Sequence, residues 1–134
     1  MKRETLFRHC AETYGTKPEY LWESTPTCAV LRNEKSGKWY GIVMDIPRNR
    51  LGIKGEEPVD ILNVKSDPIL IGSLLSEDGF FPAYHMHKGN WITILLDGTV
   101  EEEQIKFLLD ISYDLVSPKR KKKKAPGKKA DAPK

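Results

Sequence analysis

His85 and His87 are the two residues whose spacing best suits a metal site. Alternate residues of a β-strand face the same side, so a strand here would place both imidazoles on one face. Zinc needs at least one further protein ligand. The remaining histidine, His9, and the nearest cysteine, Cys28, stand at no metal-motif spacing. We therefore predict a structural or surface role for the two histidines, and no bound metal or other cofactor.

The sequence has no pattern typical of a catalytic nucleophile or of a phosphate-binding loop. It contains no G-x-S-x-G motif, no Walker-type glycine loop and no G-x-G-x-x-G motif. Asp45, Asp60 and Asp67 are scattered along the chain, and strand ends or helix capping account for them. We therefore expect a protein that binds rather than catalyses.

A run of cations near the C-terminus gives the clearest functional signal: Lys119, Arg120, Lys121, Lys122, Lys123 and Lys124. Residues 117–134 hold nine Lys or Arg and one Asp, a net charge of +8. Such runs bind nucleic acid through phosphate charge and counterion release, without reading bases. Anionic membranes and acidic proteins are competing partners, and solubility alone is a further explanation. The low apolar content predicts a disordered tail.

The rest of the chain is mildly acidic. Residues 1–116 hold 13 Lys or Arg and 18 Asp or Glu, a net charge of −5. Residues 1–116, the body of the protein, are therefore not expected to form the main surface for DNA unless their cations cluster on one face. Arg32, Lys35 and Lys38 around a predicted first hairpin, and Lys88 at a second, are the best candidates for such a cluster.

Hydrophobic periodicity and turn residues predict the elements that position these side chains, within one domain over residues 1–116. We expect helices over residues 3–14, 68–76 and 100–116, and strands over 27–33, 38–46, 58–65, 82–87 and 91–96. Residues 48–57 read as a loop with a short extended piece at Leu51–Ile53. Asp67 precedes a proline as a capping residue, and Thr99 with Glu102 matches a capping box. Ile105, Leu108, Leu109, Ser112 and Val116 trace one face of the last helix.

The order helix, three strands, helix, two strands, helix predicts an α+β fold. Hairpin connections favour a mainly antiparallel, five-stranded sheet in two layers, with helices packed on the sheet.

The two cysteines, Cys10 and Cys28, make no disulfide framework. Cys10 falls on the apolar face of the first predicted helix, where a buried, reduced thiol is expected. The N-terminus has no apolar signal-peptide core, and no apolar run approaches membrane-spanning length. We therefore expect a cytoplasmic protein.

Three stretches carry a resemblance to a known family. They are Pro18–Glu23 with Ala29–Arg32 and Lys38–Tyr40, then Asp60–Pro68, and then Pro82–Trp91 through Leu96–Gly98. In these stretches the chain resembles the MmcQ/YjbR family, small bacterial proteins usually described as predicted DNA-binding. The resemblance covers nearly all of residues 1–116 and none of the tail. It implies an α–β(3)–α–β(2)–α fold, likened to frataxin-type and secretion-chaperone-like domains, and a nucleic-acid partner.

The chain departs from the family pattern in the third stretch. Where the family usually has Asn after Tyr-His-(Met/Leu) and His before Trp, this chain has His87 and Asn90. Lys65, His85, Lys88 and Trp91 also lie within the family stretches. They would form a patch for phosphate or a planar ring if the third strand and last hairpin were neighbours. The alternative is that Trp91 lies in the core and the lysines only solvate an edge.

A second functional hypothesis is a protein-interaction or small-ligand module, as the chaperone-like fold suggests. It predicts an exposed apolar patch, or a pocket lined by Trp22, Trp39 or Trp91. The sequence leaves the partner, any base preference and the oligomeric state open.

Overall fold

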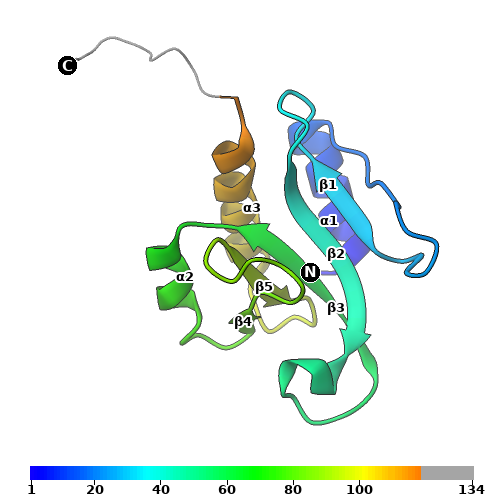
Figure 1. Cartoon of the computed structure of the whole chain (residues 1–134), viewed down its shortest axis with the longest axis vertical. Coiled ribbons are helices and arrows are strands. Elements are labelled where there is room, and N and C mark those ends of the chain that lie inside the picture. Colours follow the sequence, from blue (N-terminus) through cyan, green and yellow to red (C-terminus); the bar gives the residue numbers. More distant parts are fainter. Residues whose placement is uncertain (119–134) are drawn as a thin grey trace.

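The computed structural model describes residues 1–118 (Figure 1). Residues 119–134, which include the whole predicted cationic run, lie outside the described residues. The elements in chain order are α1 (Arg3–Tyr14), β1 (Ala29–Arg32), β2 (Trp39–Pro47), the short 3-10 helix η1 (Arg48–Leu51), β3 (Pro58–Lys65), α2 (Pro68–Leu74), β4 (Phe80–Pro82), β5 (Trp91–Leu95) and α3 (Glu102–Val116). This order confirms the predicted α+β fold.

The five strands form one antiparallel sheet in the order β1-β2-β3-β5-β4. Ile42, Asn63, Thr93 and Phe81 lie opposite one another on β2, β3, β5 and β4. Opposite residues of an antiparallel ladder share a face, so this row faces one side of the sheet. The next row, with Val43 on β2, faces the other side.

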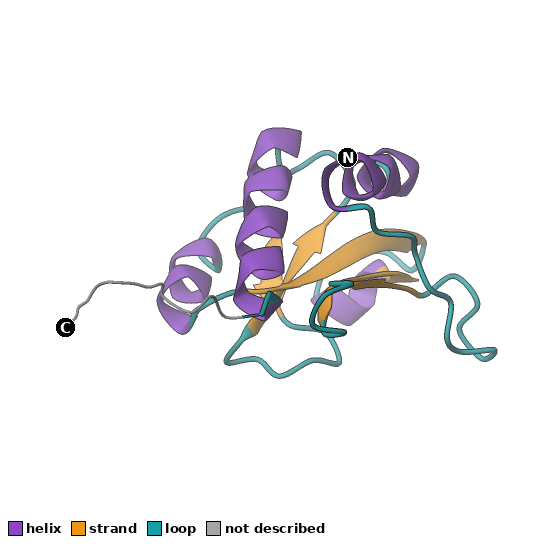
Figure 2. Ribbon diagram, turned by 90° about the horizontal axis from the view of Figure 1, so that it is seen from above, coloured by secondary structure: helices purple, strands orange, loops and turns teal. Residues whose placement is uncertain are grey.

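The main core lies between the sheet and the helices α1 and α3, which Figure 2 shows on the same side of the sheet. Leu6 and Cys10 of α1 share a buried cluster with Leu62 at the sheet centre. The five predicted core positions of α3 are all buried. Cys10 is a free, buried cysteine, as the position on the apolar face of α1 predicted. The 3.6-residue periodicity therefore identified the buried face of α3 and the buried position of Cys10 correctly, whereas Ala11 of α1 and Leu75 after α2, also predicted on apolar faces, are exposed.

The opposite face of the sheet has a smaller buried cluster, formed by Ile46, Val59, Ile61 and Leu95. The remainder of this face, around Ile42 and Met44, forms the floor of a groove. The candidate site lies on this side of the sheet.

Two predictions about local structure were wrong, one after η1 and one before α3. The segment Leu51–Ile53 is not extended, because η1 ends at Leu51 and Gly52 follows in the left-handed region with φ 80°. Thr99 does not cap α3. Its N–H and its hydroxyl both donate to the Asp97 carboxylate, and Glu101 precedes the helix without a side-chain cap bond.

The predicted strand over residues 82–87 was also wrong, because β4 ends at Pro82. The chain then makes a long loop over residues 83–90 before β5 begins at Trp91. His85 adopts a φ of 60°, which no regular strand residue does. The prediction that His85 and His87 share one face of a strand is therefore wrong too, because both residues lie in the loop after β4.

None of the helices within residues 1–118 combines the length and the apolarity needed to cross a membrane.

Candidate functional site

Two fully buried polar side chains fix the start of the loop over residues 83–90. Thr93 Oγ1 accepts a hydrogen bond from the Tyr84 N–H at 2.9 Å, and its hydroxyl donates to Asn63 Oδ1. Asn63 Nδ2 donates to the Tyr84 carbonyl oxygen at 3.0 Å. Both backbone groups of Tyr84 are thus satisfied by side chains of the central strands. This arrangement replaces the strand ladder that the sequence predicted.

The next residue, His85, has left-handed backbone geometry, with φ 60°. Such a conformation is uncommon for a residue with a side chain and persists where the surroundings determine it. The His85 ring lies 4.1 Å from the Tyr84 ring, centroid to centroid, with the planes tilted by 47°. The loop therefore presents a fixed pair of rings over the sheet.

A second wall is formed by the chain before β1 together with Trp39, the first residue of β2. The Trp22 and Trp39 rings meet edge to face with their centroids 5.8 Å apart. The Arg3 guanidinium donates to the Thr27 carbonyl oxygen at 2.6 Å, and the Thr27 hydroxyl donates to the Asp45 carboxylate. A backbone bridge between Glu19 and Val30 holds the start of the segment against β1. The segment over residues 22–28 is thus held before its start by the Glu19–Val30 bridge and near its end by the hydrogen bonds of Thr27.

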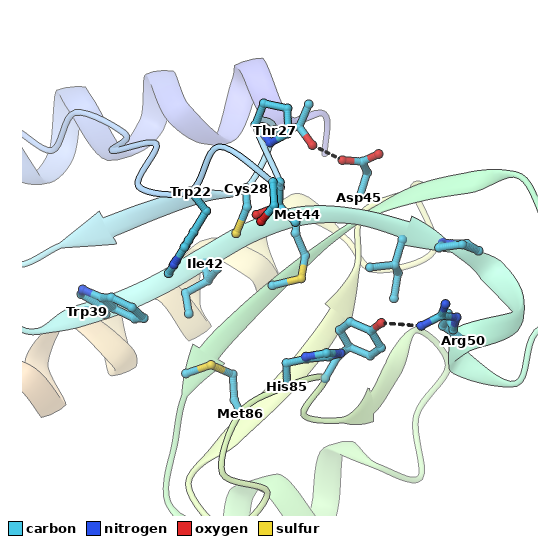
Figure 3. Close-up of a pocket in the computed structure, with 16 residues that line it drawn as sticks. Trp22, Thr27, Cys28, Trp39, Ile42, Met44, Asp45, Arg50, His85 and Met86 are labelled. Atoms are coloured by element: carbon cyan, nitrogen blue, oxygen red, sulfur yellow. Dashed lines mark hydrogen bonds between the residues drawn. The ribbon is translucent and has the colours of Figure 1, made fainter.

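A groove of about 620 Å³ lies between these two walls. Its floor is the face of β2 that carries Ile42 and Met44. Figure 3 shows Trp22, Met44 and Met86 extending into the same space, with His85 beside them. The lining is mostly apolar and aromatic, which is typical of a site for a small ligand or an unpaired ring.

A second recess of about 430 Å³ adjoins the groove, and Arg50, Tyr84 and His85 line both. Lys88 lines the second recess only, and among residues 1–118 no carboxylate lines this recess. Arg50 Nη1 donates to the Tyr84 hydroxyl oxygen at 3.3 Å. Within residues 1–118, neither Arg50 nor Lys88 forms a salt bridge. The recess therefore offers two cations to an anion.

Arg32, the first of the predicted nucleic-acid contacts, is occupied by an internal ion pair. Its guanidinium donates to both carboxylate oxygens of Glu19, at 3.0 and 3.1 Å, and to the Gly37 carbonyl oxygen at 2.8 Å. The bonds from Arg32 lower the pKa of Glu19, and the same pair raises the pKa of Arg32. Arg32 thus braces the β1–β2 turn.

The other two cations of this turn, Lys35 and Lys38, are exposed. Asn33, buried at the base of the turn, donates from Nδ2 to Ser117 Oγ at 2.9 Å. Its Oδ1 accepts from the N–H groups of Lys35 and Ser36. The chain therefore leaves α3 beside the turn that carries the two lysines, as Figure 1 shows. The predicted contacts Lys119 to Lys124 follow directly in sequence but lie outside the described residues.

The residues of the predicted family patch are only partly brought together. Lys65 and Trp91 are direct partners across β3 and β5, and the Asn90 carbonyl oxygen accepts from the Ser66 N–H at 2.8 Å. His85, by contrast, lies in the groove, and Trp91 does not line it.

The exchanged pair of the family motif, His87 and Asn90, is joined through the backbone. The Asn90 N–H donates to the His87 carbonyl oxygen at 3.2 Å, while His87 Nδ1 accepts from the Gly89 N–H at 3.2 Å. In the part of the chain that the structure describes, no three His, Cys, Asp or Glu side chains gather as a metal site would need.

The sequence analysis identified Trp22, Trp39 and Lys88 but missed five further residues of the site: Asn63, Thr93, Met44, Met86 and Arg50. Asn63 and Thr93 are polar residues in apolar strands, which was an available signal. Nothing in the local pattern connected them to Tyr84, since the bonds span 9 and 21 residues.

Comparison with known proteins agrees with the fold and the motifs. The sequence model of the YjbR family matches residues 11–115. The uncharacterized protein YyaQ of Bacillus subtilis (strain 168) is 40% identical over 115 residues, which cover 86% of this chain and 98% of that protein. A crystal structure of a Pseudomonas syringae protein is 40% identical with a TM-score of 0.84, covering 87% of this chain and 99% of that chain. Deinococcus radiodurans protein DR2400 shares the fold at 24% identity, with a TM-score of 0.64 over 84% of this chain and 76% of that one. The chain therefore belongs to the YjbR family.

Proposed function

We propose that this protein binds nucleic acid without catalysing a reaction, mainly through non-specific contacts to phosphate. The observation that carries the proposal is the bond between Asn33 and Ser117, 2.9 Å long. It holds Ser117, at the end of α3, beside the turn that carries Lys35 and Lys38. We propose that the turn lysines and the six cations that follow in sequence, residues 119–124, contact the phosphate backbone together.

The charge distribution supports a main role for the C-terminal segment in attracting nucleic acid. Residues 1–116 carry a net charge of −5, from 13 cations and 18 carboxylates, so long-range attraction for a polyanion comes from the C-terminal segment. Contacts of this kind release counterions and position the protein, but they do not read sequence. The free cysteines Cys10 and Cys28 fit a reducing compartment, and the proposal therefore includes a cytoplasmic location.

The test is the affinity for a fluorescent, mixed-sequence DNA duplex at low and at physiological salt. The full chain is compared with a variant in which all six residues 119–124 are Ser, and with a matched variant in which all six are Arg. The proposal predicts strong loss of low-salt binding for the Ser variant and retained binding for the Arg variant. Equal duplex affinity of the Ser variant and the full chain would contradict the role of this segment.

A second candidate function is a small-ligand or protein-interaction module. The aromatic groove favours it, because Trp22 and Trp39 line a concave site of about 620 Å³. A ligand screen read through protection of the folded chain against thermal unfolding tests this function. A ligand that stabilises the chain, and fails to stabilise a Trp22→Ala variant, would support it.

A further inference from the structure

We infer that the groove and the adjoining cationic recess together hold one unstacked nucleotide, with its base in the groove and its phosphate in the recess. The inference rests on the proposed nucleic-acid function and deepens it. It assigns to the folded body a site for single-stranded rather than duplex nucleic acid, separate from the β1–β2 turn.

The groove has the surface that a flat ring requires. Trp22 and Trp39 stand on one wall, and Tyr84 and His85 stand on the other. Aromatic side chains bind exposed bases by stacking, without a strong preference for one base. Met44 adds a polarizable thioether, which packs well against ring edges. A base paired in a duplex is stacked on both sides and cannot enter such a site.

The recess supplies what the phosphate requires. Arg50 and Lys88 line it, and within residues 1–118 no carboxylate lines the recess and neither cation forms a salt bridge. The carboxylate of the adjoining groove, Asp45, accepts from the Thr27 hydroxyl. Arg50 also lines the groove, so one guanidinium lies where the two spaces meet. Its planar donors suit the oxygens of a phosphate. A purely apolar ligand would leave this charge unused.

The wall between the two spaces is held in place before any ligand arrives. Asn63 and Thr93 bind both backbone groups of Tyr84 and are fully buried. His85 keeps its left-handed backbone immediately after that anchor. A preformed wall lowers the ordering cost of binding, so a weak stacking contact can contribute measurable affinity.

The experiment uses the full chain and four fluorescent probes in anisotropy titrations at one fixed salt concentration. The probes are a single strand of mixed sequence, its duplex, an abasic single strand of equal length, and a nucleoside monophosphate. The site variants are Trp22→Ala and Arg50→Gln. Their matched controls are Tyr20→Ala and Lys54→Gln, exposed neighbours that line neither space. Urea unfolding verifies that each variant is folded.

We expect the single strand to bind more tightly than the duplex and the abasic strand. Each site variant should weaken single-strand affinity by about tenfold, the effect typical of removing one stacking or charged interaction, with both controls within about twofold. A nucleoside monophosphate that binds and competes with the single strand would show that the site also accepts a free nucleotide. A strand that binds without such competition would identify nucleic acid.

Two outcomes overturn the site. One is an abasic strand that binds as tightly as the normal strand. The other is unchanged single-strand affinity in both folded site variants. If duplex binding that depends on residues 119–124 persists in either case, the proposed function stands and only the nucleotide site fails. If no probe binds the full chain, both fail.

Discussion

Asn63 Nδ2 donates a hydrogen bond to the Tyr84 carbonyl oxygen at 3.0 Å and so joins the central strand β3 to the loop over residues 83–90. This bond spans 21 residues of sequence. Tyr84 lines both the groove and the cationic recess, and the position of their common wall depends on this bond.

The Thr93→Val substitution tests that anchor. It keeps the shape of the side chain but removes the hydroxyl that serves both Tyr84 and Asn63. We expect a loss of about 1–3 kcal/mol in the free energy of unfolding, because buried polar groups lose their partner. Urea unfolding measures it. The exposed substitution Thr25→Val is the control, expected within about 0.5 kcal/mol of the wild type. Equal stability of the two variants would show that the anchor is unimportant.

The Ser112→Ala substitution tests how α3 is fixed to the sheet. The Ser112 hydroxyl donates to the Tyr40 carbonyl oxygen at 2.6 Å and accepts from the Lys65 N–H at 2.8 Å. Both backbone groups lose a partner in the variant, so we expect a loss of about 1–3 kcal/mol in the free energy of unfolding. The exposed Ser73→Ala change is the matched control in the same urea titration. A stability equal to the wild type would contradict the bridging role.

Glu19 gives a prediction about pH. The hydrogen bonds from Arg32 lower its pKa in the folded state below the ordinary value of 4.5. Its contribution to stability is therefore fully present above that value and is lost as the pH falls through the lower folded pKa. We expect the stability difference between the wild type and Glu19→Gln, measured by urea unfolding, to be present at pH 7 and to shrink below about pH 4.

The control for this prediction is Glu12→Gln, an exposed glutamate of α1 with no salt bridge within residues 1–118. The change in stability difference between pH 7 and low pH should be larger for Glu19→Gln than for this control. A Glu19→Gln difference that is constant from pH 7 to pH 3 would contradict the assigned cause.

The sequence predicted the fold well because its main signals are local. The helices α1 and α3 follow from apolar residues at three- and four-residue spacing, and the cap of α2 follows from Asp67 before Pro68. Asp67 indeed accepts hydrogen bonds from the Ile69 and Leu70 N–H groups. Each of these features is decided within about one turn of helix.

The errors arose where distant or competing groups decide the structure. The predicted strand over residues 82–87 fails because Asn63 and Thr93 take the backbone groups of Tyr84. Thr99 does not cap α3 because its N–H and its hydroxyl both donate to the carboxylate of Asp97, two residues before it. The short extended piece fails because η1 runs to Leu51 and Gly52 follows in the left-handed region, and in this conformation Leu51 and Ile53 pack against the second core cluster. No periodicity reports such tertiary packing.

The candidate site was predictable in its residue types but not in its assembly. The cations Arg32, Lys35, Lys38 and Lys88 were identified from their positions around the two predicted hairpins. The structure divides them, with Arg32 bound to Glu19 and Lys88 in the recess beside Arg50. Ion pairing between Arg32 and Glu19 across 13 residues is a tertiary interaction that charge counting does not reveal.

The salt dependence of duplex binding tests the central claim most directly. Affinity for one mixed-sequence duplex is measured over a series of salt concentrations, for the full chain and for the variant with Ser at all six positions 119–124. We expect a linear fall of log affinity with log salt for the full chain. In the variant, the slope should be reduced by about 0.9 for each phosphate that is no longer neutralised by a Lys or Arg. Identical slopes for the two proteins, or no duplex binding by the full chain at low salt, would contradict the account.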